Sequence, residues 1–383
     1  MQLNNEQALA LVREGAGLLQ RGLAQDARAR LEQVTRTGRA NTQIWLLLAS
    51  ACQAQGDPAG EEAALDSALA LDPTLIRGQI MKGDCRVKAG DERGALEFYQ
   101  CALRWAESAE LPPVLAAEVD RARTAVAQYA ARGEAEREQT LATRGFPPAA
   151  RSARFAESLE ILAGRKEIFV QRPTGYYFPG LPAIQFFDTA PFDWVPAVEQ
   201  ATGTIRAELD GLLAGGAAGF RPYLHGDPDR ARMDPENRLL DSPDWSALFL
   251  CESGVRDEAA IVACPRTWAA VQAPPWPRIA NSPTVMFSLL RPGARIAPHT
   301  GMFNTRLVCH LPLIVPPGCG FRVGNEVREW EEGKLLVFDD SIEHEAWNDS
   351  DRDRVVLIFD IWRPDLTKQE RAEIDALFAG KLG

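Results

Sequence analysis

Residues 304–318 read NTRLVCHLPLIVPPG, an apolar run that ends in two prolines and a glycine. Its branched apolar residues and turn-forming end are typical of a β-strand. Similar runs lie on both sides of it: TVMFSLLRPG (284–293), GFRVGNEVREWEEG (320–333), KLLVFDD (334–340) and DRVVLIFDIWRP (353–364). Within the second of these, Gly324-Asn325 has the composition of a two-residue hairpin turn. Several short antiparallel strands with Pro/Gly turns predict a β-sandwich or jelly roll, closed as a double-stranded β-helix.

The first hundred residues have a different composition and contain a repeat. Alanine, leucine, glutamine and arginine are common, and Gly22, Gly56 and Gly90 are spaced by 34 residues. Small residues (Gly15, Ala49, Gly83) precede these glycines by seven positions, and larger ones (Leu31, Leu65, Tyr99) follow by nine. A period of 34 with closely packed helix pairs resembles the tetratricopeptide repeat; an unrelated helical bundle is the alternative. We expect three repeats, the first degenerate, with a small concave surface suited to a peptide or a partner helix.

These patterns predict a multidomain chain. Residues 1–110 form all-α tetratricopeptide-like repeats, and residues 111–150 form a connecting or capping helix. Residues 151–383 form the double-stranded β-helix (jelly-roll, cupin-like) domain with flanking helices. One such helix is expected at 192–213, where the sequence FDWVPAVEQATGTIRAELDGLL is amphipathic.

Charge and composition exclude several classes of partner. The 383 residues carry a net charge of -11 and no long basic run, which argues against a nucleic-acid-binding surface and a polybasic membrane patch. No apolar stretch approaches the ~20 residues of a membrane-spanning helix. The N-terminus lacks the features of a secretory signal. The seven scattered cysteines contain no C-x-x-C and are expected to be free thiols. We therefore predict a cytoplasmic protein without a membrane span.

Three of the four histidines lie between His299 and His344, in the strand-rich region. Two widely spaced histidines on a small β-barrel indicate the metal site of a non-haem Fe(II) oxygenase, which normally adds one carboxylate. Two residues after His299, however, the chain has Gly301. Each histidine taken alone also fits a structural or surface role.

Strand periodicity predicts which side chains share a face, because alternate residues of a strand point the same way. One face carries Arg306, Val308 and His310, and another carries Arg354, Val356, Ile358 and Asp360. Arg354 opens an apolar strand and needs a partner, since an unpaired buried charge is costly. Two interpretations stay open: an ion pair with an acid such as Asp360 or Asp340, or a grip on a dicarboxylate ligand through two parallel N–H groups.

Residues 287–366 closely resemble the catalytic domain of the aspartyl/asparaginyl β-hydroxylase family. The resemblance rests on PHTG…N.R…H, WEEGK…FDDS.EHE.W and R….D.W.P, and extends weakly to SPDWSALFL (242–250) and YYFPGLPAIQFFD (176–188). It implies a dioxygenase that uses Fe(II), 2-oxoglutarate and O2 to hydroxylate an unactivated C–H bond. Animal members also carry a tetratricopeptide region before the oxygenase, as this chain does in layout.

The resemblance also implies roles for individual residues. His299 and His344 match the two iron ligands, and Gly301 matches the family's glycine, so water is expected in the third position. Arg354 matches the arginine that binds the 2-oxoglutarate carboxylate, and it counts with the two histidines as catalytic. Ser288 and His310 match residues that assist this arginine, and Trp245 matches a tryptophan that lines the 2-oxoglutarate pocket. Arg306 matches an arginine that holds an acidic substrate. Val308 departs from the family, whose animal members have a second arginine there.

The leading prediction is hydroxylation of the β-carbon of an Asp/Asn or related side chain in a peptide or protein, which the repeats can hold. One alternative keeps the iron but acts on a free amino acid or a lipid acyl chain. Another is halogenation, since a glycine in place of the carboxylate leaves room for chloride. The non-enzymatic alternative is an inert repeat scaffold or binding protein.

Overall fold

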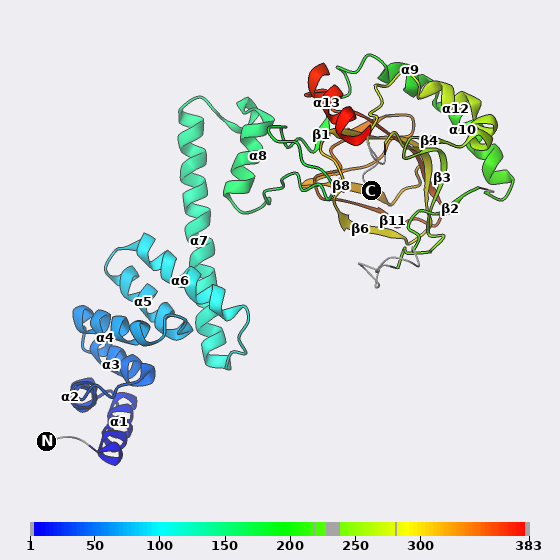
Figure 1. Ribbon diagram of the computed structural model, residues 1–383. Helices are drawn as coiled ribbons and strands as arrows, with labels where there is room; N and C mark the ends of the chain where they lie inside the picture. Colours follow the sequence, from blue (N-terminus) through cyan, green and yellow to red (C-terminus); the bar gives the residue numbers. More distant parts are fainter. Residues whose placement is uncertain (1–3, 218, 227–237, 280–281, 380–383) are drawn as a thin grey trace. The chain divides into compact units, whose positions relative to one another are not determined.

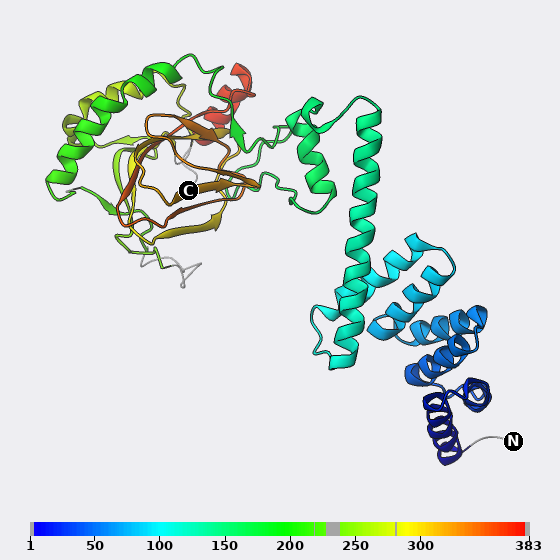
Figure 2. The same ribbon diagram turned by 180° about the vertical axis from the view of Figure 1, so that it is seen from behind.

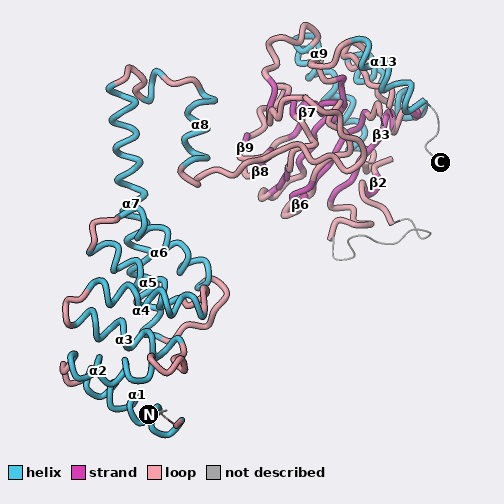
Figure 3. The backbone as a smooth tube through the Cα atoms, turned by 60° about the vertical axis from the view of Figure 1, so that its left-hand side comes forward, coloured by secondary structure: helices cyan, strands magenta, loops and turns pink. Residues whose placement is uncertain are grey.

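The computed structural model describes residues 4–217, 219–226, 238–279 and 282–379. The chain divides into two compact units that meet between Ala163 and Gly164. The first unit is helical, and the second contains the strands, as the colouring of Figure 3 shows. Within the described residues, no helix is long and apolar enough to cross a membrane.

The first unit begins with helix pairs (Figure 1). Their bounds are α1 (Asn5–Gln20) with α2 (Ala24–Thr35), α3 (Thr42–Ala54) with α4 (Pro58–Leu71), and α5 (Ile76–Lys88) with α6 (Glu92–Ala106). Each pair turns at a repeat glycine, because Gly22, Gly56 and Gly90 have φ of 75°, 69° and 76°, a region that side chains disfavour. The tetratricopeptide-like prediction is therefore confirmed.

The small residues of the repeat allow the paired helices to pack closely. A Cβ atom on Gly83 would lie 2.5 Å from Tyr99 Cε1, and one on Gly15 would lie 3.0 Å from Leu31 Cγ. The long helix α7 (Pro113–Thr143) packs on α6 through the buried Val119 and Ala122. The unit ends with the short η1 (Pro148–Ala150) and with α8 (Ala153–Leu162).

In its described part, the second unit contains an eight-stranded and a four-stranded antiparallel sheet (Figures 1 and 2). The larger sheet has the order β1 (Phe186–Phe187), β10 (Leu336–Phe338), β7 (Arg306–Ile314), β12 (Arg354–Trp362), β5 (Val285–Leu290), β3 (Trp245–Glu252), β2 (Arg221–Pro222), with β4 (Val255–Arg256) beside β3. The smaller has the order β6 (Arg295–His299), β11 (His344–Asn348), β8 (Cys319–Val323), β9 (Glu326–Arg328). The double-stranded β-helix prediction is confirmed. Val323 pairs with Glu326, so Gly324-Asn325 is the predicted hairpin turn.

The alternation of β7 and β12 explains the layers. Leu307 and Leu357 belong to an apolar cluster with Val198, Ile205 and Leu209. Those three residues come from α9 (Val195–Gln200) and α10 (Thr202–Ala214), which cover one face of the larger sheet together with α12 (Pro265–Ala270). The opposite face turns to the smaller sheet, so its side chains line the space between the two. The unit also contains α11 (Glu258–Ala263) and α13 (Lys368–Ala379).

The single helix expected at 192–213 is in fact two helices, so that prediction was wrong in its detail. Helix α9 ends at Gln200, and α10 begins at Thr202. The Thr202 hydroxyl donates to the Glu199 carbonyl at 2.6 Å, and the Thr204 hydroxyl donates to the Ala201 carbonyl at 2.7 Å. Threonine side chains that bond nearby carbonyls favour such breaks over a continuous helix.

Candidate active site

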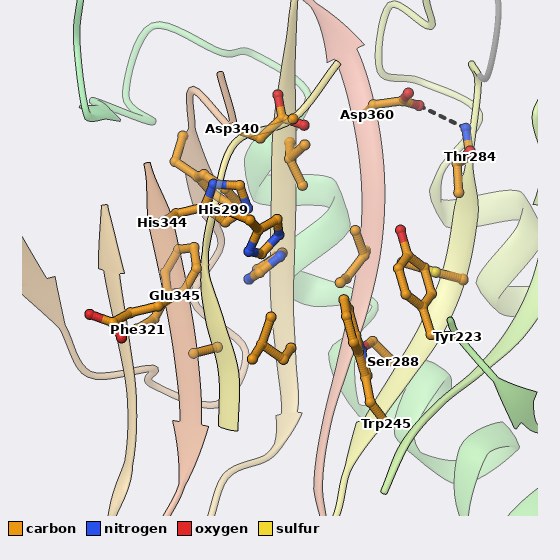
Figure 4. Close-up of a pocket in the computed structure, with 18 of the residues that line it drawn as sticks. Tyr223, Trp245, Thr284, Ser288, His299, Phe321, Asp340, His344, Glu345 and Asp360 are labelled. Carbon is orange, nitrogen blue, oxygen red and sulfur yellow. Dashed lines mark hydrogen bonds between the residues drawn. The ribbon is translucent and has the colours of Figure 1, made fainter. Parts of the chain in front are cut away.

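A cavity of about 660 Å³ opens between the two sheets. All the site residues predicted from the sequence line it: Trp245, Ser288, His299, Arg306, His310, His344 and Arg354. Figure 4 shows His299 and His344 on neighbouring strands, with Trp245 and Ser288 across the cavity. The fold thus brings together residues that are spread over 110 positions of the sequence.

His299 and His344 form a pair. His299 ends β6, His344 begins β11, and the two residues are register partners. Their ring centroids are 4.2 Å apart. His299 Nδ1 lies 2.8 Å from the Ala297 carbonyl, and His344 Nδ1 lies 3.0 Å from the Ile342 carbonyl. A carbonyl accepts only, so each Nδ1 carries the proton and each Nε2 keeps its lone pair.

The electrostatics of the histidine pair favour neutral rings. Burial lowers the pKa of His299, and burial together with the neighbouring His299 ring lowers the pKa of His344 to about 3. Neutral imidazoles with free Nε2 atoms are the form that binds metal ions. Within the described residues, no group of three or more His, Cys, Asp or Glu is placed to hold a metal. In their neutral form, His299 and His344 are two side chains that could hold a metal in this cavity.

Arg354 is a buried cation that has no acidic partner among the residues that the structure describes. Only 1% of the residue is exposed, and Nε and Nη1 have no hydrogen-bond partner in the described part of the chain. Its guanidinium carbon lies 4.8 Å from the centre of the Trp330 ring. Burial lowers its pKa to about 10, because no carboxylate among the described residues compensates for the lost hydration. Of the two interpretations open for Arg354, the ion pair with Asp340 or Asp360 is not formed in the described part of the chain, where both acids pair with Arg306 instead.

Three predicted residues surround this guanidinium's part of the cavity. Trp245 Nε1 donates to Ser288 Oγ at 3.2 Å, and the Trp245 ring stacks on Tyr223 with centroids 4.2 Å apart. His310 packs between Phe321 and Phe338, and its buried Nδ1 has no partner among the described residues. Burial, aided by Arg354, holds the pKa of His310 well below its usual value. These polar groups are available to a ligand.

Arg306 lies in the cavity but is already paired. Its Nη1 donates to Asp360 Oδ2 at 2.8 Å, and its Nη2 donates to Asp340 Oδ2 at 3.0 Å. Both acids are buried, and burial raises the pKa of both, that of Asp340 to about 6. One arginine between two carboxylates leaves no excess positive charge at this wall.

Comparisons with known proteins show which family this chain resembles. The family model for aspartyl/asparaginyl beta-hydroxylase matches residues 199–364. The ornithine lipid ester-linked acyl 2-hydroxylase of Rhizobium tropici is 37% identical over 231 residues, which cover 59% of this chain and 76% of that protein. The human aspartyl/asparaginyl beta-hydroxylase is 39% identical over 146 residues, 38% of this chain. The chain belongs to the aspartyl/asparaginyl β-hydroxylase family.

The similarity to the family lies in the second unit of this chain, and it covers only part of the length of some relatives. The match spans 19% of the human β-hydroxylase, against three quarters of the bacterial one. Among solved structures, PcrH from Pseudomonas aeruginosa is 19% identical, with coverage of 33% of this chain and 93% of PcrH and a TM-score of 0.30. The family match lies within the second unit of this family member, and the first unit is helical.

The glycine of this β-hydroxylase family member is required by its neighbour. Gly301 N donates to the Asp340 carbonyl at 2.6 Å. A Cβ atom at position 301 would overlap the Asp340 carboxylate, which fills the space in front of the glycine. A third ligand at position 301 is therefore sterically incompatible with the Arg306–Asp340 ion pair.

Gly301→Ala is expected to destabilise the protein by about 1–3 kcal/mol, the usual cost of overpacking. The new methyl group displaces Asp340 and breaks one of the ion pairs of Arg306. Urea unfolding of the wild-type and Gly301→Ala proteins measures the change in the free energy of unfolding. The matched control is Gly203→Ala on helix α10, where a Cβ atom meets nothing within 4 Å and helix propensity favours alanine. Equal stability of the Gly301→Ala and wild-type proteins would contradict the expectation.

Sequence reasoning missed part of the cavity wall. Tyr223, Phe249 and Glu252 line the cavity, but the sequence of residues 215–277 predicts only mixed helix and loop. That prediction was wrong for Phe249 and Glu252, which lie in strand β3. Trp330, in the WEEGK motif, was also missed; it does not line the cavity, but its ring lies against the Arg354 guanidinium. Tyr223 and Trp330 were not detectable by periodicity, because Tyr223 follows a two-residue strand and Trp330 lies in a loop.

Proposed function

We propose that the chain is an Fe(II)- and 2-oxoglutarate-dependent hydroxylase. The observation that supports this best is Arg354, a buried guanidinium with unfilled donors in the same cavity as the histidine pair. Such a site binds a carboxylate strongly, because charge-assisted hydrogen bonds in a dry cavity are among the strongest polar contacts. A dicarboxylic keto acid would pair one carboxylate with Arg354 and keep its keto-acid end free for a metal in the same cavity.

Each residue has one task in this proposal. His299 and His344 would hold Fe(II) through Nε2, since each Nδ1 is committed to a backbone carbonyl. When bound, the iron, the keto acid and O2 supply the oxidising power for C–H hydroxylation. Arg354 binds the distal carboxylate of the keto acid, and Ser288 and His310 offer further donors. The apolar walls of the cavity keep water away from these contacts.

The test is a visible spectrum recorded without oxygen. Fe(II) followed by 2-oxoglutarate should produce a metal-to-ligand charge-transfer band in the full-length protein. Zn(II) in place of Fe(II) is the control, because its filled d shell gives no such band. Absence of the band in protein that is folded by circular dichroism would overturn the oxygenase proposal.

For the substrate, the cavity supports a neutral aliphatic chain, such as a lipid acyl chain, over an acidic side chain. Binding a substrate carboxylate through Arg306 would take it from Asp340 and Asp360 and leave buried carboxylates unpaired, which is strongly unfavourable. Apolar side chains line much of the remaining wall: Met286, Ile296, Val308, Phe321, Phe338 and Ile358. The name of the Rhizobium tropici relative also specifies an acyl chain.

A β-carbon of Asp or Asn in a peptide is the second candidate. The 39% identity with the human aspartyl/asparaginyl beta-hydroxylase favours it. The helix pairs of residues 1–110 would then provide a surface for the polypeptide or for a separate partner. This candidate requires Arg306 to exchange its carboxylate partners for the substrate.

We expect an ornithine lipid to stimulate succinate formation at least about tenfold more than an aspartate-containing peptide, the factor that 1.4 kcal/mol of discrimination supplies. The reason is the neutralised Arg306. Succinate release at equal substrate concentrations measures the preference, and turnover without substrate gives the background. An Asn-containing peptide is the matched control, since it has nearly the same shape without the charge. A preference for the aspartate peptide would favour the second candidate.

A further inference from the structure

A segment that precedes the sheets runs along both loops that carry the histidines. This segment, residues 171–182, is called the strap below. It bonds first to the loop that follows His299. Thr174 N donates to the Gly301 carbonyl at 3.0 Å, and Tyr176 N donates to the Met302 carbonyl at 2.9 Å. A loop that is hydrogen-bonded along its backbone in this way has few alternative conformations.

The strap also bonds to the loop that precedes His344. Arg172 N donates to the Ser341 carbonyl at 2.7 Å. Asp339 in the same loop is fully buried and forms an ion pair with the fully buried Arg363 at 2.5 Å. Arg363 in turn donates to the carbonyl of Pro182, the last residue of the strap. Both ends of the strap are therefore fixed to the loop at 339–341.

Gln171 is the side chain that joins the two loops directly. Its Nε2 donates to Asp339 Oδ2 at 2.6 Å, and its Oε1 accepts from Asn304 Nδ2 at 2.9 Å. Asn304 is fully buried and also bonds the strap, because its Oδ1 accepts from Phe178 N at 2.7 Å. Gln171 is 9% exposed, so water competes little for these bonds. Both functions of its amide are used, one on each loop.

We propose that Gln171 is a positioning residue that sets the spacing of His299 and His344, an inference that rests on the proposed iron site. The two rings approach to 4.2 Å only while the loops behind them keep their separation. A metal requires its ligand atoms within about 0.2 Å of their ideal distances. Toward the cavity, the same loops are joined by Gly301 N and Asp340. Gln171 provides a second tie, through residues that do not line the cavity.

The test uses the full-length chain without metal and then with Co(II) as the probe. In Gln171→Leu, which keeps the bulk but removes both bonds, amide hydrogen exchange should accelerate about tenfold or more in residues 299–304 and 339–344. The dissociation constant for Co(II), followed through its visible bands, should rise about 10- to 100-fold, as for other residues that orient metal ligands. Tyr177→Ala on the same strap is the control, because the Tyr177 side chain is 54% exposed, and it should change neither quantity.

A second variant separates the two halves of the tie and provides a test that does not depend on the folding of Gln171→Leu. Gln171→Glu keeps an oxygen for Asn304 but turns a carboxylate toward Asp339. Exchange should then accelerate at 339–344 and stay near the wild-type rate at 299–304. Unchanged exchange in both loops, or wild-type Co(II) affinity in Gln171→Leu, would overturn the inference. If the wild-type protein binds no Co(II), the proposed iron site fails, while the exchange data still decide whether Gln171 couples the loops.

Discussion

Replacing Arg354 by methionine is expected to raise the melting temperature of the ligand-free protein and to weaken 2-oxoglutarate binding by about 100-fold or more. The guanidinium is buried with no carboxylate partner among the described residues, and its pKa is lowered to about 10. A lowered pKa means that the charged form is less stable in the folded protein than in the unfolded chain. Methionine fills a similar volume beside Trp330 without that cost. Removal of an uncompensated buried charge is worth on the order of 1–3 kcal/mol, or several degrees of melting temperature.

The loss of binding follows from the same feature. Charge-assisted hydrogen bonds contribute about 1.5–3 kcal/mol each, so losing two of them weakens the binding of 2-oxoglutarate by about 100-fold or more. Thermal unfolding without ligand gives the first quantity, and titration of the anaerobic Fe(II) band gives the second. Arg151→Met is the matched control. The Arg151 side chain is 6% exposed, is paired with Glu138 and lies outside the cavity lining, so its loss should lower stability and leave 2-oxoglutarate affinity unchanged. A less stable Arg354→Met protein that still binds 2-oxoglutarate would refute the assignment.

The contrast between Arg354 and Arg306 shows how far strand periodicity reaches. Alternation alone places Arg306, Val308 and His310 on one face, and all three line the cavity. Alternation also places Arg354 and Asp360 on one face, which left an ion pair between them open. The strand rise excludes that pair, because six residues span roughly 20 Å. Periodicity therefore predicts the face of a side chain, and distance along the strand limits its partners.

The true partners of Arg306 depend on contacts between distant segments. Arg306 faces Trp362 across the β7–β12 pairing, which brings it near Asp360, and Asp340 arrives from the turn after β10. None of these pairings follows from local sequence. The strap was equally hidden, since Gln171 contacts residues 133 and 168 positions away. By contrast, the repeat glycines and the Gly324-Asn325 turn were predictable, because each acts through its own backbone conformation.

His344→Ala is expected to abolish Co(II) and Fe(II) binding and, with it, all succinate formation. In the described part of the chain, no third side-chain ligand compensates for the loss, because the histidine pair belongs to no larger metal-binding group. Substituting a residue that hydrogen-bonds a metal ligand already lowers metal affinity about 10- to 100-fold. Losing one of two ligands should therefore lower the affinity by more than about 100-fold. Co(II) titration and succinate release measure the two effects separately.

The fold should tolerate His344→Ala. His344 lies at the start of β11 and pairs with His299 and Val323 through its backbone, which the substitution leaves in place. Because the imidazole is neutral, its removal breaks no ion pair. His225→Ala is the matched control, since His225 is an exposed histidine that does not line the cavity. It should retain wild-type affinity. A His344→Ala protein that binds Co(II) as tightly as the His225→Ala protein would place the metal elsewhere. The cavity of Arg354 would then be a binding site for an organic anion alone.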